Sequence, residues 1–414
     1  MLEQVEAATP QPSAALHGLR VIEFGGPVAA PFCGHLLALL GADVIKVEPP
    51  SVGDPARHHG PFPRDAADPE RSGLFLALNA SKKSVTLDVS KAEGRALLIE
   101  LVTRSDILVE SGVPSQMEEW ALDFAHLREV NSRLIVMSLT PFGWSGPYRD
   151  YKAYDINCQA LSGMVEGLGW PPREPLAYPY SQAAVQAGLS AACATCVAVL
   201  LRGRTNEGCH VDISETEVLA ALHMGIYVLS YIFMGNKAMR GNAIESRRIY
   251  PHGFTKAKDG YVYRNAPQLA QWLRFLEIVG NPKWVKEPRY RDRRAMAAEY
   301  PAEVDALLAP WFMARSREQV FRECQEKRVP FCPVFNIGES MESPQIKARG
   351  FLAEVERTDT GPLRHPGLPV HFSATPWRIT RPAPFLGEHN EEIYRGLLGM
   401  DEKRLAELRA SGTV

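Results

Sequence analysis

A stretch near the N-terminus, Leu16–Pro50, constrains the fold of this chain more than any other part of the sequence. Within it, Leu19–Phe24 and Val44–Glu48 are short apolar runs of the kind found in buried strands. Between them, glycines break the pattern and Phe32–Leu40 has the apolar spacing of a helix. Two strands joined through a helix predict a right-handed βαβ unit, which is the start of a parallel sheet.

The alternation of strands and helices continues to about residue 140. The sequence predicts further strands at Lys83–Val89, Asp106–Glu110 and Leu134–Leu139, and helices at Lys91–Arg104 and Met117–Val130. Buried strands that alternate with helices predict an α/β fold with a large, doubly wound parallel-sheet domain. The glycines after the first strand lack the G-x-G-x-x-G spacing, so the sequence does not predict a dinucleotide-binding fingerprint.

The later part of the chain predicts a second, smaller domain. Helices are expected at Asp155–Val165, Gln182–Leu201 and Glu215–Met234, the second of them long and buried. From residue 235 charged residues become dense, and Phe254–Tyr263 reads as a hairpin around Asp259-Gly260. We therefore expect a large α/β domain that begins in one segment and ends in another, with a smaller α+β domain between them: 1–225, 226–330 and 331–414.

Composition argues against several classes of protein. The chain has 414 residues, 45% of them hydrophobic and 23% charged, and a formal net charge of −2. This charge gives no electrostatic reason to expect nucleic acid or an anionic membrane as a partner. No apolar run reaches the roughly 18 residues of a membrane span. Residues 1–15 lack the basic and apolar regions of a signal peptide, so we expect a cytoplasmic protein.

The cysteines and histidines do not predict a metal centre. Seven cysteines and eleven histidines are scattered along the chain. Cys193 and Cys196 have the spacing of a redox or metal-binding pair, but no second pair or histidine cluster lies near them in the sequence. Because reduced cysteine behaves as a small hydrophobe, we expect these two to be buried core thiols. We expect no bound metal.

Several separate phrases, in order over nearly the whole chain, resemble the family III CoA-transferases, which include formyl-CoA transferase and the carnitine and bile-acid CoA-transferases. The phrases are Leu16–Pro50, Leu76–Val89, Ser138–Tyr148, Tyr154–Gly163, Gly203–Glu217, His252–Tyr263 and Pro382–Gly399. The resemblance implies that coenzyme A, carried as acyl-CoA, is a substrate together with a carboxylic acid. It also implies a dimer in which two chains are interlinked.

The resemblance also implies that the usual nucleophile is missing. Family members use an aspartate to attack the acyl-CoA thioester, and it lies four residues before a glycine at the start of the long buried helix. Counting back four residues from Gly188 gives Ala184, whose methyl group has no lone pair for the attack. No aspartate or glutamate occurs between Glu174 and Glu207.

Other residues near the expected pocket are candidates for catalysis or substrate binding. Asp155 is the best remaining acid, although a carboxylate at a helix N-terminus is also favoured by the helix dipole alone. Tyr154 stands where racemases of this fold carry a histidine, so a racemase is less expected, and Tyr154 is a candidate substrate contact. Arg247 and Arg248 are candidates to pair with a carboxylate substrate, or they lie in an exposed loop.

Binding of CoA requires cations for its phosphates and a close approach of the backbone. The candidates are Lys46, Arg57, Lys82, Lys83 and Arg104, with Asn79 at the turn before a strand and Gly25 where the backbone can approach a ligand. For each cation the alternative is a solvated surface charge. For Gly25 the alternative is a turn between a strand and a helix.

Three functional interpretations stay open. The first is a subunit of a heteromeric CoA-transferase whose homologous partner supplies the aspartate, as in the succinyl-CoA:benzylsuccinate CoA-transferases. The second is a homomeric transferase, racemase, hydrolase or lyase with altered chemistry that uses Asp155 or a water. The third is a non-catalytic scaffold that binds acyl-CoA. We favour the first, because the fold phrases are intact while the reactive side chain is absent.

Overall fold

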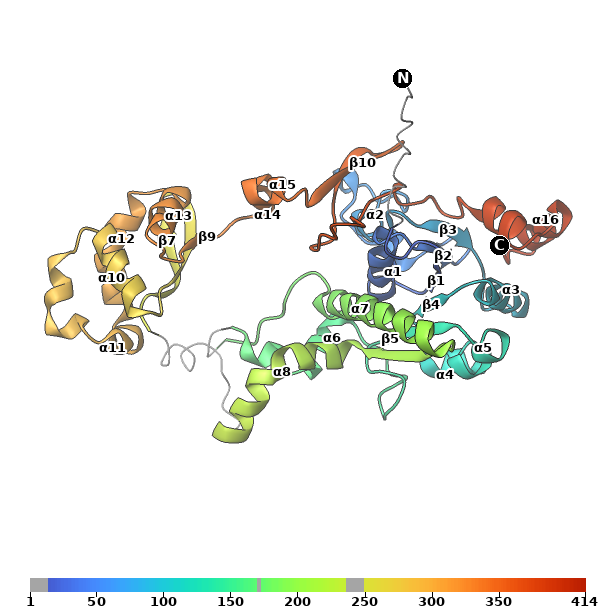
Figure 1. Cartoon of the computed structure of the whole chain (residues 1–414), viewed down its shortest axis with the longest axis horizontal. Helices are drawn as coiled ribbons and strands as arrows, with labels where there is room; N and C mark the ends of the chain where they lie inside the picture. Colours follow the sequence, from blue (N-terminus) through green and yellow to red (C-terminus); the bar gives the residue numbers. More distant parts are fainter. Residues whose placement is uncertain (1–13, 170–172, 236–248) are drawn as a thin grey trace, which may run out of the picture. The chain divides into compact units, whose positions relative to one another are not determined.

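The computed structural model describes residues 14–169, 173–235 and 249–414, and it divides into two compact units (Figure 1). The larger unit is made of residues 1–164, 177–229 and 348–414, and the smaller one of residues 165–176 and 230–347. The predicted substrate contacts Arg247 and Arg248 lie outside the described residues. The domain boundaries expected from the sequence stay predictions.

The larger unit is built on a six-stranded parallel sheet, which confirms the predicted α/β fold class. Its strands are β1 (Arg20–Phe24), β2 (Asp43–Glu48), β3 (Lys83–Thr86), β4 (Ile107–Glu110), β5 (Ile135–Thr140) and β6 (His210–Ser214). They lie in the order β3-β2-β1-β4-β5-β6. The order reverses between β1 and β4, and open parallel sheets bind ligands outside the carboxyl ends of the strands at such a point.

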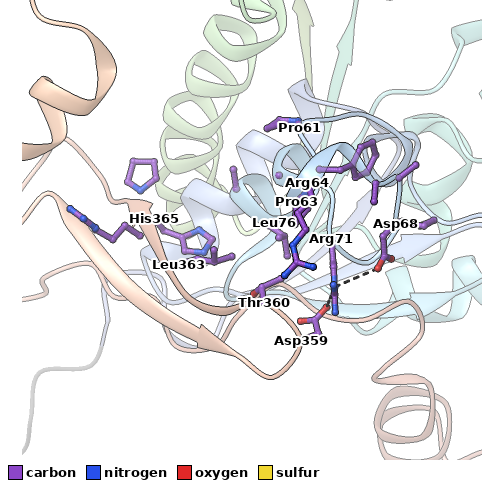
Figure 2. Close-up of a pocket in the computed structure, with 18 residues that line it drawn as sticks. Pro61, Pro63, Arg64, Asp68, Arg71, Leu76, Asp359, Thr360, Leu363 and His365 are labelled. Atoms are coloured by element: carbon purple, nitrogen blue, oxygen red, sulfur yellow. Dashed lines mark ion pairs between the residues drawn. The ribbon is translucent and has the colours of Figure 1, made fainter.

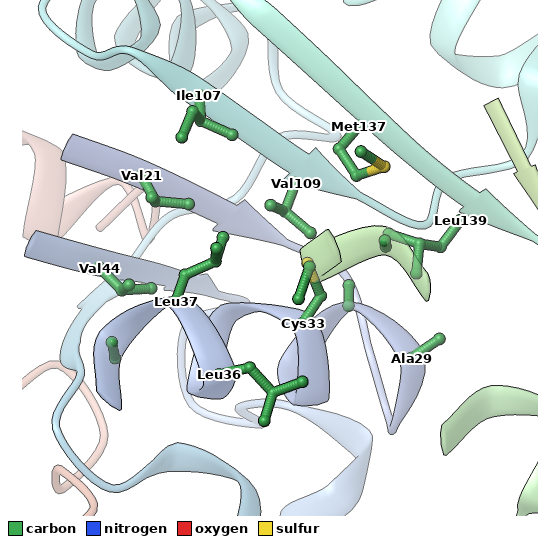
Figure 3. Packing of buried hydrophobic residues seen from close by; sticks show 14 of the residues in the cluster. Val21, Ala29, Cys33, Leu36, Leu37, Val44, Ile107, Val109, Met137 and Leu139 are labelled. Atoms are coloured by element: carbon green, nitrogen blue, oxygen red, sulfur yellow. The ribbon is translucent and has the colours of Figure 1, made fainter. Parts of the chain in front are cut away.

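Two helices cover one face of this sheet, α1 (Ala29–Leu39) and α7 (Gln182–Thr205). Cys33 and Leu37 of α1 belong to the same buried cluster as Val109 of β4. Figure 3 shows these side chains of α1 directed toward the strands. Because successive side chains of a strand point to opposite faces of the sheet, the neighbours of these strand residues pack on the other face.

The opposite face of the sheet packs against α3 (Ala92–Thr103) and α16 (Glu402–Ala410). Leu108 of β4 shares a buried cluster with Leu98 of α3 and Leu405 of α16. The C-terminal segment of the chain therefore completes the core that the N-terminal strands begin. Helices on both faces are what a doubly wound sheet requires.

The predicted helix Met117–Val130 is wrong, because the structure has two helices there, α4 (Pro114–Glu119) and α5 (Phe124–Val130). Between them Ala121 has a left-handed backbone with φ 55°. The side chain of Asp123 then caps α5 by accepting hydrogen bonds from two backbone N–H groups of its first turn. An aspartate at this position starts a new helix, which the apolar periodicity did not reveal.

The prediction that α7 is a buried helix is wrong for its outer side. Leu189, Val197 and Leu200 are 42%, 65% and 69% exposed. Cys193 is exposed and Cys196 half-buried, so the expectation of two buried core thiols is also wrong. By length and composition α7 is apolar enough to cross a membrane, while its inner side packs on α1 in the core.

The larger unit contains further helices and strands. The helices are α2 (Gly73–Asn79), α6 (Asp155–Leu161) and α8 (Glu215–Met234), whose residues from 230 onward belong to the smaller unit, and the strands are β10 (Leu352–Arg357) and β11 (Gly361–Pro366). The last two form an antiparallel hairpin. This hairpin was not predicted, because its segment reads as proline-rich loop.

The smaller unit has an antiparallel sheet packed with helices, as expected for an α+β unit. Its strands are β7 (His252–Ala257), β8 (Gly260–Asn265) and β9 (Cys332–Pro333). Its helices are α10 (Leu269–Ile278), α11 (Arg293–Ala298), α12 (Pro301–Met313), α13 (Arg317–Glu326), α14 (Ile337–Glu342) and α15 (Pro344–Ala348). The predicted hairpin is present, and Gly260 has a φ of 152° at its turn.

Candidate active site

The N-terminus of α7 presents the position at which the nucleophile was expected. Ala184 lies in the first turn of this helix and is 8% exposed. Ser181, which precedes the helix, makes no capping hydrogen bond through its side chain. Instead, Oδ1 of Asp155 accepts hydrogen bonds from the backbone N–H groups of Ala183 (2.7 Å) and Ala184 (3.2 Å). Asp155 therefore caps α7 from the neighbouring helix α6.

The second oxygen of Asp155 is also held. The Gln159 side-chain amide donates to Oδ2 over 2.6 Å. The same Gln159 side chain donates to the Tyr178 carbonyl and accepts from the Tyr178 N–H, so its orientation is fixed by three contacts. Both oxygens of Asp155 are thus used to order backbone and amide N–H groups. This geometry fits the helix-capping alternative given for Asp155, and its catalytic role stays a prediction.

Gly188 allows the first turns of α7 to pack closely against α1. A Cβ atom at Gly188 would lie 2.7 Å from the Ala29 carbonyl oxygen and 3.1 Å from Cβ of Phe32. Both neighbours belong to α1, so the two helices cross at a separation that only glycine allows. A glycine one turn after Ala184 therefore sets the position of that residue against the sheet.

Sequence reasoning missed Glu215, the first residue of α8. Burial raises the pKa of Glu215 to about 7, the nearby Asp155 carboxylate raises it further in the same direction, and a hydrogen bond with Cys158 opposes the shift. Cys158 packs against Ala183 at the start of α7. A signal was present in the sequence, because an acidic residue directly follows the last residue of β6 at the carboxyl edge of the sheet.

The turn after β1 lies at the reversal point of the strand order. Gly25 has a φ of 113°, and a Cβ atom there would lie 2.3 Å from Oγ of Ser111, just beyond β4. The next residue, Gly26, would place a Cβ 2.5 Å from a carboxylate oxygen of Asp54. Side chains are excluded at both positions, so the backbone itself is presented at this edge.

Glu110, the last residue of β4, is a second acid that sequence reasoning missed. It is fully buried, and its Oε2 accepts a hydrogen bond from the Gly112 N–H over 2.6 Å. Burial raises the pKa of Glu110 to about 7, and the nearby polar groups of Ser138, Gly112 and Trp144 offset only part of this rise. Its other oxygen has no hydrogen-bond partner within the described part of the chain.

The family of the chain follows from a match over most of its length. The model of the family described as CoA-transferase family III matches residues 16–390. The chain belongs to this family. It is therefore a CoA-transferase by family, and an acyl-CoA is the substrate class that fits. The family match does not depend on Ala184 or on any other single position.

Relatives with assigned names support this family. The succinyl-CoA–D-citramalate CoA-transferase of Chloroflexus aurantiacus is 33% identical over 98% of this chain and 100% of its own length. The beta subunit of a succinyl-CoA–L-malate CoA-transferase from Chloroflexus aurantiacus is 29% identical over 96% of this chain and 98% of its own length. The alpha subunit is 30% identical over 97% of this chain and 93% of its own length. A solved CAIB/BAIF family protein from Brucella suis superposes with a TM-score of 0.83, at 29% identity over 93% of this chain and all of that one.

Several of the predicted CoA-binding residues of this family III chain lie in a buried ion network. Arg57 is fully buried, donates to both oxygens of Glu48 (2.7 and 2.9 Å) and to Glu70 (2.9 Å), and stacks on Phe75. Its guanidinium donors are therefore engaged inside the unit. The proposal that Arg57 meets a CoA phosphate stays a prediction, and the geometry favours a structural role.

Lys82, Lys46 and Asn79 are equally enclosed. The ammonium groups of Lys82 and Lys46 lie 2.7 and 2.8 Å from the two carboxylate oxygens of Glu23. Lys82 also donates to the Asn79 side chain and to a carbonyl of α1. All four side chains are fully buried. Burial lowers the pKa of Lys82 to about 8, in spite of the nearby Glu23.

Lys83 and Arg104 lie elsewhere, at the amino ends of the strands. They line a pocket of about 460 Å³ together with Arg20 and Asp43, the first residues of β1 and β2. Lys83 pairs there with Asp43 over 2.7 Å. The structure thus divides the predicted CoA-binding cations into an enclosed group and a group at the edge opposite to the Gly25 turn.

Tyr154 is the predicted substrate contact that lies within the described residues. Its side chain is 83% exposed, and its backbone N–H donates a hydrogen bond to the Asn157 side-chain oxygen at the start of α6. It directly precedes Asp155, so it lies beside the capped start of α7. Its role as a substrate contact stays a prediction.

Proposed function

We propose that this chain is a subunit of a CoA-transferase in which a homologous chain supplies the aspartate nucleophile. The donor is an acyl-CoA of the succinyl-CoA type, and the acceptor is a carboxylic acid. The observation that carries the proposal is Ala184, an alanine methyl at the start of α7 where the family resemblance implies a carboxylate. Asp155 does not replace the missing nucleophile, because its carboxylate accepts hydrogen bonds from the backbone N–H groups of Ala183 and Ala184.

The proposed reaction needs a carboxylate on the partner. That carboxylate attacks the thioester carbonyl, CoA leaves as the thiolate, and an anhydride forms between the partner and the acyl group. The thiolate then attacks the partner's carbonyl, releases the donor acid and leaves a thioester of CoA with the partner. Attack by the acceptor acid and return of CoA complete the exchange. In this chain the Gly25 turn supplies backbone at the reversal point of the sheet, where CoA approaches.

Two observations support a homologous partner. The relatives include a malate enzyme whose alpha and beta subunits both match this chain over nearly its full length. In addition, the outer side of α7 and the helix α6 expose large apolar side chains: Leu161, Val197 and Leu200 are each at least 60% exposed. Exposed apolar surface of this kind is typical of an interaction site. An interlinked pair of chains and a cytoplasmic location are part of the same proposal.

Co-expression tests the proposal. The chain is produced alone and together with a family III chain that carries aspartate four residues before its helix glycine, and succinyl-CoA transfer to an acid is measured. We expect transfer only from the pair. Transfer by the purified chain alone, at a rate similar to that of the pair, would overturn the proposal.

A variant of the lone chain sharpens this test. Ala184→Asp restores the missing carboxylate, while Ala184→Ser adds a polar group of similar size that is a much weaker nucleophile in this position. We expect measurable transfer from Ala184→Asp and none from Ala184→Ser. Circular dichroism of both variants shows whether the buried position tolerates the change. Folded but inactive Ala184→Asp would mean that more than the nucleophile is missing.

Acyl-CoA hydrolysis is a second candidate, favoured by Glu215. A carboxyl with a pKa of about 7, next to the Asp155 carboxylate, suits a general base that takes a proton from water and returns it to the CoA thiolate. Release of CoA thiol by the lone chain, rising with pH through about 7 and abolished in Glu215→Gln, would support this candidate. Without such release, hydrolysis is excluded.

A further inference from the structure

A pocket in the larger unit lies away from the start of α7 (Figure 2). It has a volume of about 980 Å³, at the upper end of the size range of small-molecule sites. One wall is the segment of residues 61–73 with the start of α2, and the other is the β10–β11 hairpin. Neither Ala184 nor Asp155 lines it.

The two walls are tied together beneath the pocket. Arg357 of β10 forms an ion pair with Glu70 over 3.1 Å, and the same carboxylate pairs with the buried Arg57 over 2.9 Å. Arg357 also stacks on Phe385. Because these contacts are buried or partly buried, the cavity is held open in the absence of a ligand.

Apolar side chains form much of the lining. Phe62 and several prolines contribute from the first wall, Leu76 from α2, and Leu363 from β11. Leu76 and Leu363 belong to one buried cluster with Phe75, so this part of the pocket is continuous with a core. A ligand would bury hydrocarbon or ring surface here, which is the main source of affinity in such sites.

One cation of the lining is available to an anion. Arg71 is not, because it lies between Asp68 (3.5 Å) and Asp359 (3.8 Å), as the dashed lines in Figure 2 show. Arg64 lines the pocket and, within the described part of the chain, has no ion-pair or hydrogen-bond partner. Burial lowers the pKa of His365, which therefore adds no positive charge.

The backbone places Arg64 at this position. Arg64 and Asp65 both have left-handed backbones, with φ of 58° and 55°. Residues other than glycine adopt this conformation rarely, and two in succession are held by their surroundings. Gly73 helps to shape the segment, because it donates a hydrogen bond to the Pro61 carbonyl and a Cβ there would lie 3.0 Å from that oxygen.

We propose that this pocket binds a monoanionic carboxylic acid with an apolar body, with its carboxylate at Arg64 and its body against Phe62, Leu76 and Leu363. The site is separate from the place proposed for CoA transfer, and it does not depend on that proposal. Its occupant is a small molecule that lacks a CoA group. Free phosphate would use the same charge but not the apolar walls.

Binding of three probes to the whole chain tests the proposal by calorimetry. The probes are 4-phenylbutyrate, its uncharged amide 4-phenylbutyramide, and butyrate, which lacks the ring. We expect 4-phenylbutyrate to bind most tightly, the amide about threefold to fivefold more weakly, and butyrate more weakly still. Equal affinity for the acid and the amide, or no binding of 4-phenylbutyrate at 10 mM (about the weakest affinity calorimetry resolves), would overturn the proposal.

Two arginine variants locate the carboxylate. Arg64→Gln is expected to weaken 4-phenylbutyrate by about threefold to fivefold and to leave the amide unchanged, so that acid and amide become equal. Arg128→Gln, the matched control, removes a half-exposed arginine of the same unit that does not line the pocket. It is expected to change neither affinity. The same loss in both variants would show a general charge effect and contradict the assigned site. Inorganic phosphate that displaces 4-phenylbutyrate completely would assign the pocket to phosphate instead.

Discussion

Glu48 and Glu110 are the last residues of two strands in the same sheet, and both are fully buried. The pKa values of their carboxyl groups nevertheless shift in opposite directions. Burial alone raises the pKa of a carboxyl. At Glu48 the Arg57 guanidinium, together with Lys46 and Ser84, outweighs burial and holds the pKa below its usual range. At Glu110 hydrogen bonds are the only compensation, and the pKa rises to about 7. The presence of buried cations decides between a fixed ion and an acid that titrates near neutrality.

The comparison indicates different roles for the carboxyl ends of β2 and β4. The charged groups around Glu48 are paired with one another, and Ser84 donates a hydrogen bond to Oε1 of Glu48 over 2.6 Å. Such a network stabilises the fold. Around Glu110 the neighbours are Ser138, Trp144, Asp212 and the backbone N–H of Gly112, and β4 borders the point at which the strand order reverses. A carboxyl that exchanges its proton near pH 7 is of use only at the second place.

Breaking the ion pair has the largest expected effect. Arg57→Met keeps much of the buried volume but leaves the Glu48 carboxylate without its cation. We expect the free energy of unfolding to fall by about 3–5 kcal/mol, measured by urea denaturation. Arg322→Met is the control, because Arg322 is 73% exposed in its pair with Glu318, and it should cost less than about 1 kcal/mol. A small loss in Arg57→Met would mean that Glu48 takes up a proton at little cost.

Glu110→Gln tests the other half of the comparison through pH. In the folded chain Glu110 keeps its proton up to about pH 7, whereas in the unfolded chain it loses the proton near pH 4.5. The folded state therefore binds more protons between these values, and the stability of the wild type falls as pH rises through this window. Relative to the wild type, Glu110→Gln should gain about 2–3 kcal/mol between pH 4.5 and 7.5.

Urea denaturation at several pH values measures this difference. A constant difference between the two proteins across the window would show that Glu110 ionises normally. In that case the contrast with Glu48 would not be one of protonation, and the acid at the end of β4 would be part of the scaffold as well.

The smallest effect is expected at Asp155, a half-exposed carboxylate whose partners are N–H groups. Asp155→Ala removes the cap of α7 and should cost about 1 kcal/mol, while Asp155→Asn retains an oxygen acceptor and should cost less. Thermal unfolding of both variants checks this order. If Asp155→Asn destabilises the protein as much as Asp155→Ala, the charge rather than the cap is what matters.

The fold was largely predictable from the sequence because parallel sheets bury their strands completely. Runs such as Leu134–Leu139 are nearly continuous and apolar, Val44–Glu48 is apolar apart from two charged residues, and flanking turns are marked by glycine. The helix 117–130 was wrong because capping by Asp123 competes with apolar periodicity and leaves no trace in it. The β10–β11 hairpin was missed because its strands carry many polar residues and β11 contains two prolines.

The candidate site was less predictable, because side-chain roles depend on tertiary neighbours. Arg57 and Lys82 were sensible phosphate ligands by residue type, but their partners Glu48 and Glu23 come from different strands. Asp155 caps a helix that begins more than twenty residues later, a contact that the sequence does not specify. Ala184 differs, since its position follows from the spacing to Gly188 alone.

The most direct test of the proposed function is the intact mass of each chain after exposure to succinyl-CoA. The co-expressed pair is incubated with succinyl-CoA, quenched in acid and measured by mass spectrometry under denaturing conditions. Because Ala184 cannot form an acyl bond, we predict that this chain keeps its unmodified mass while the aspartate-bearing partner gains a covalent adduct. An adduct on this chain, mapped to any of its own carboxylates, would contradict the account.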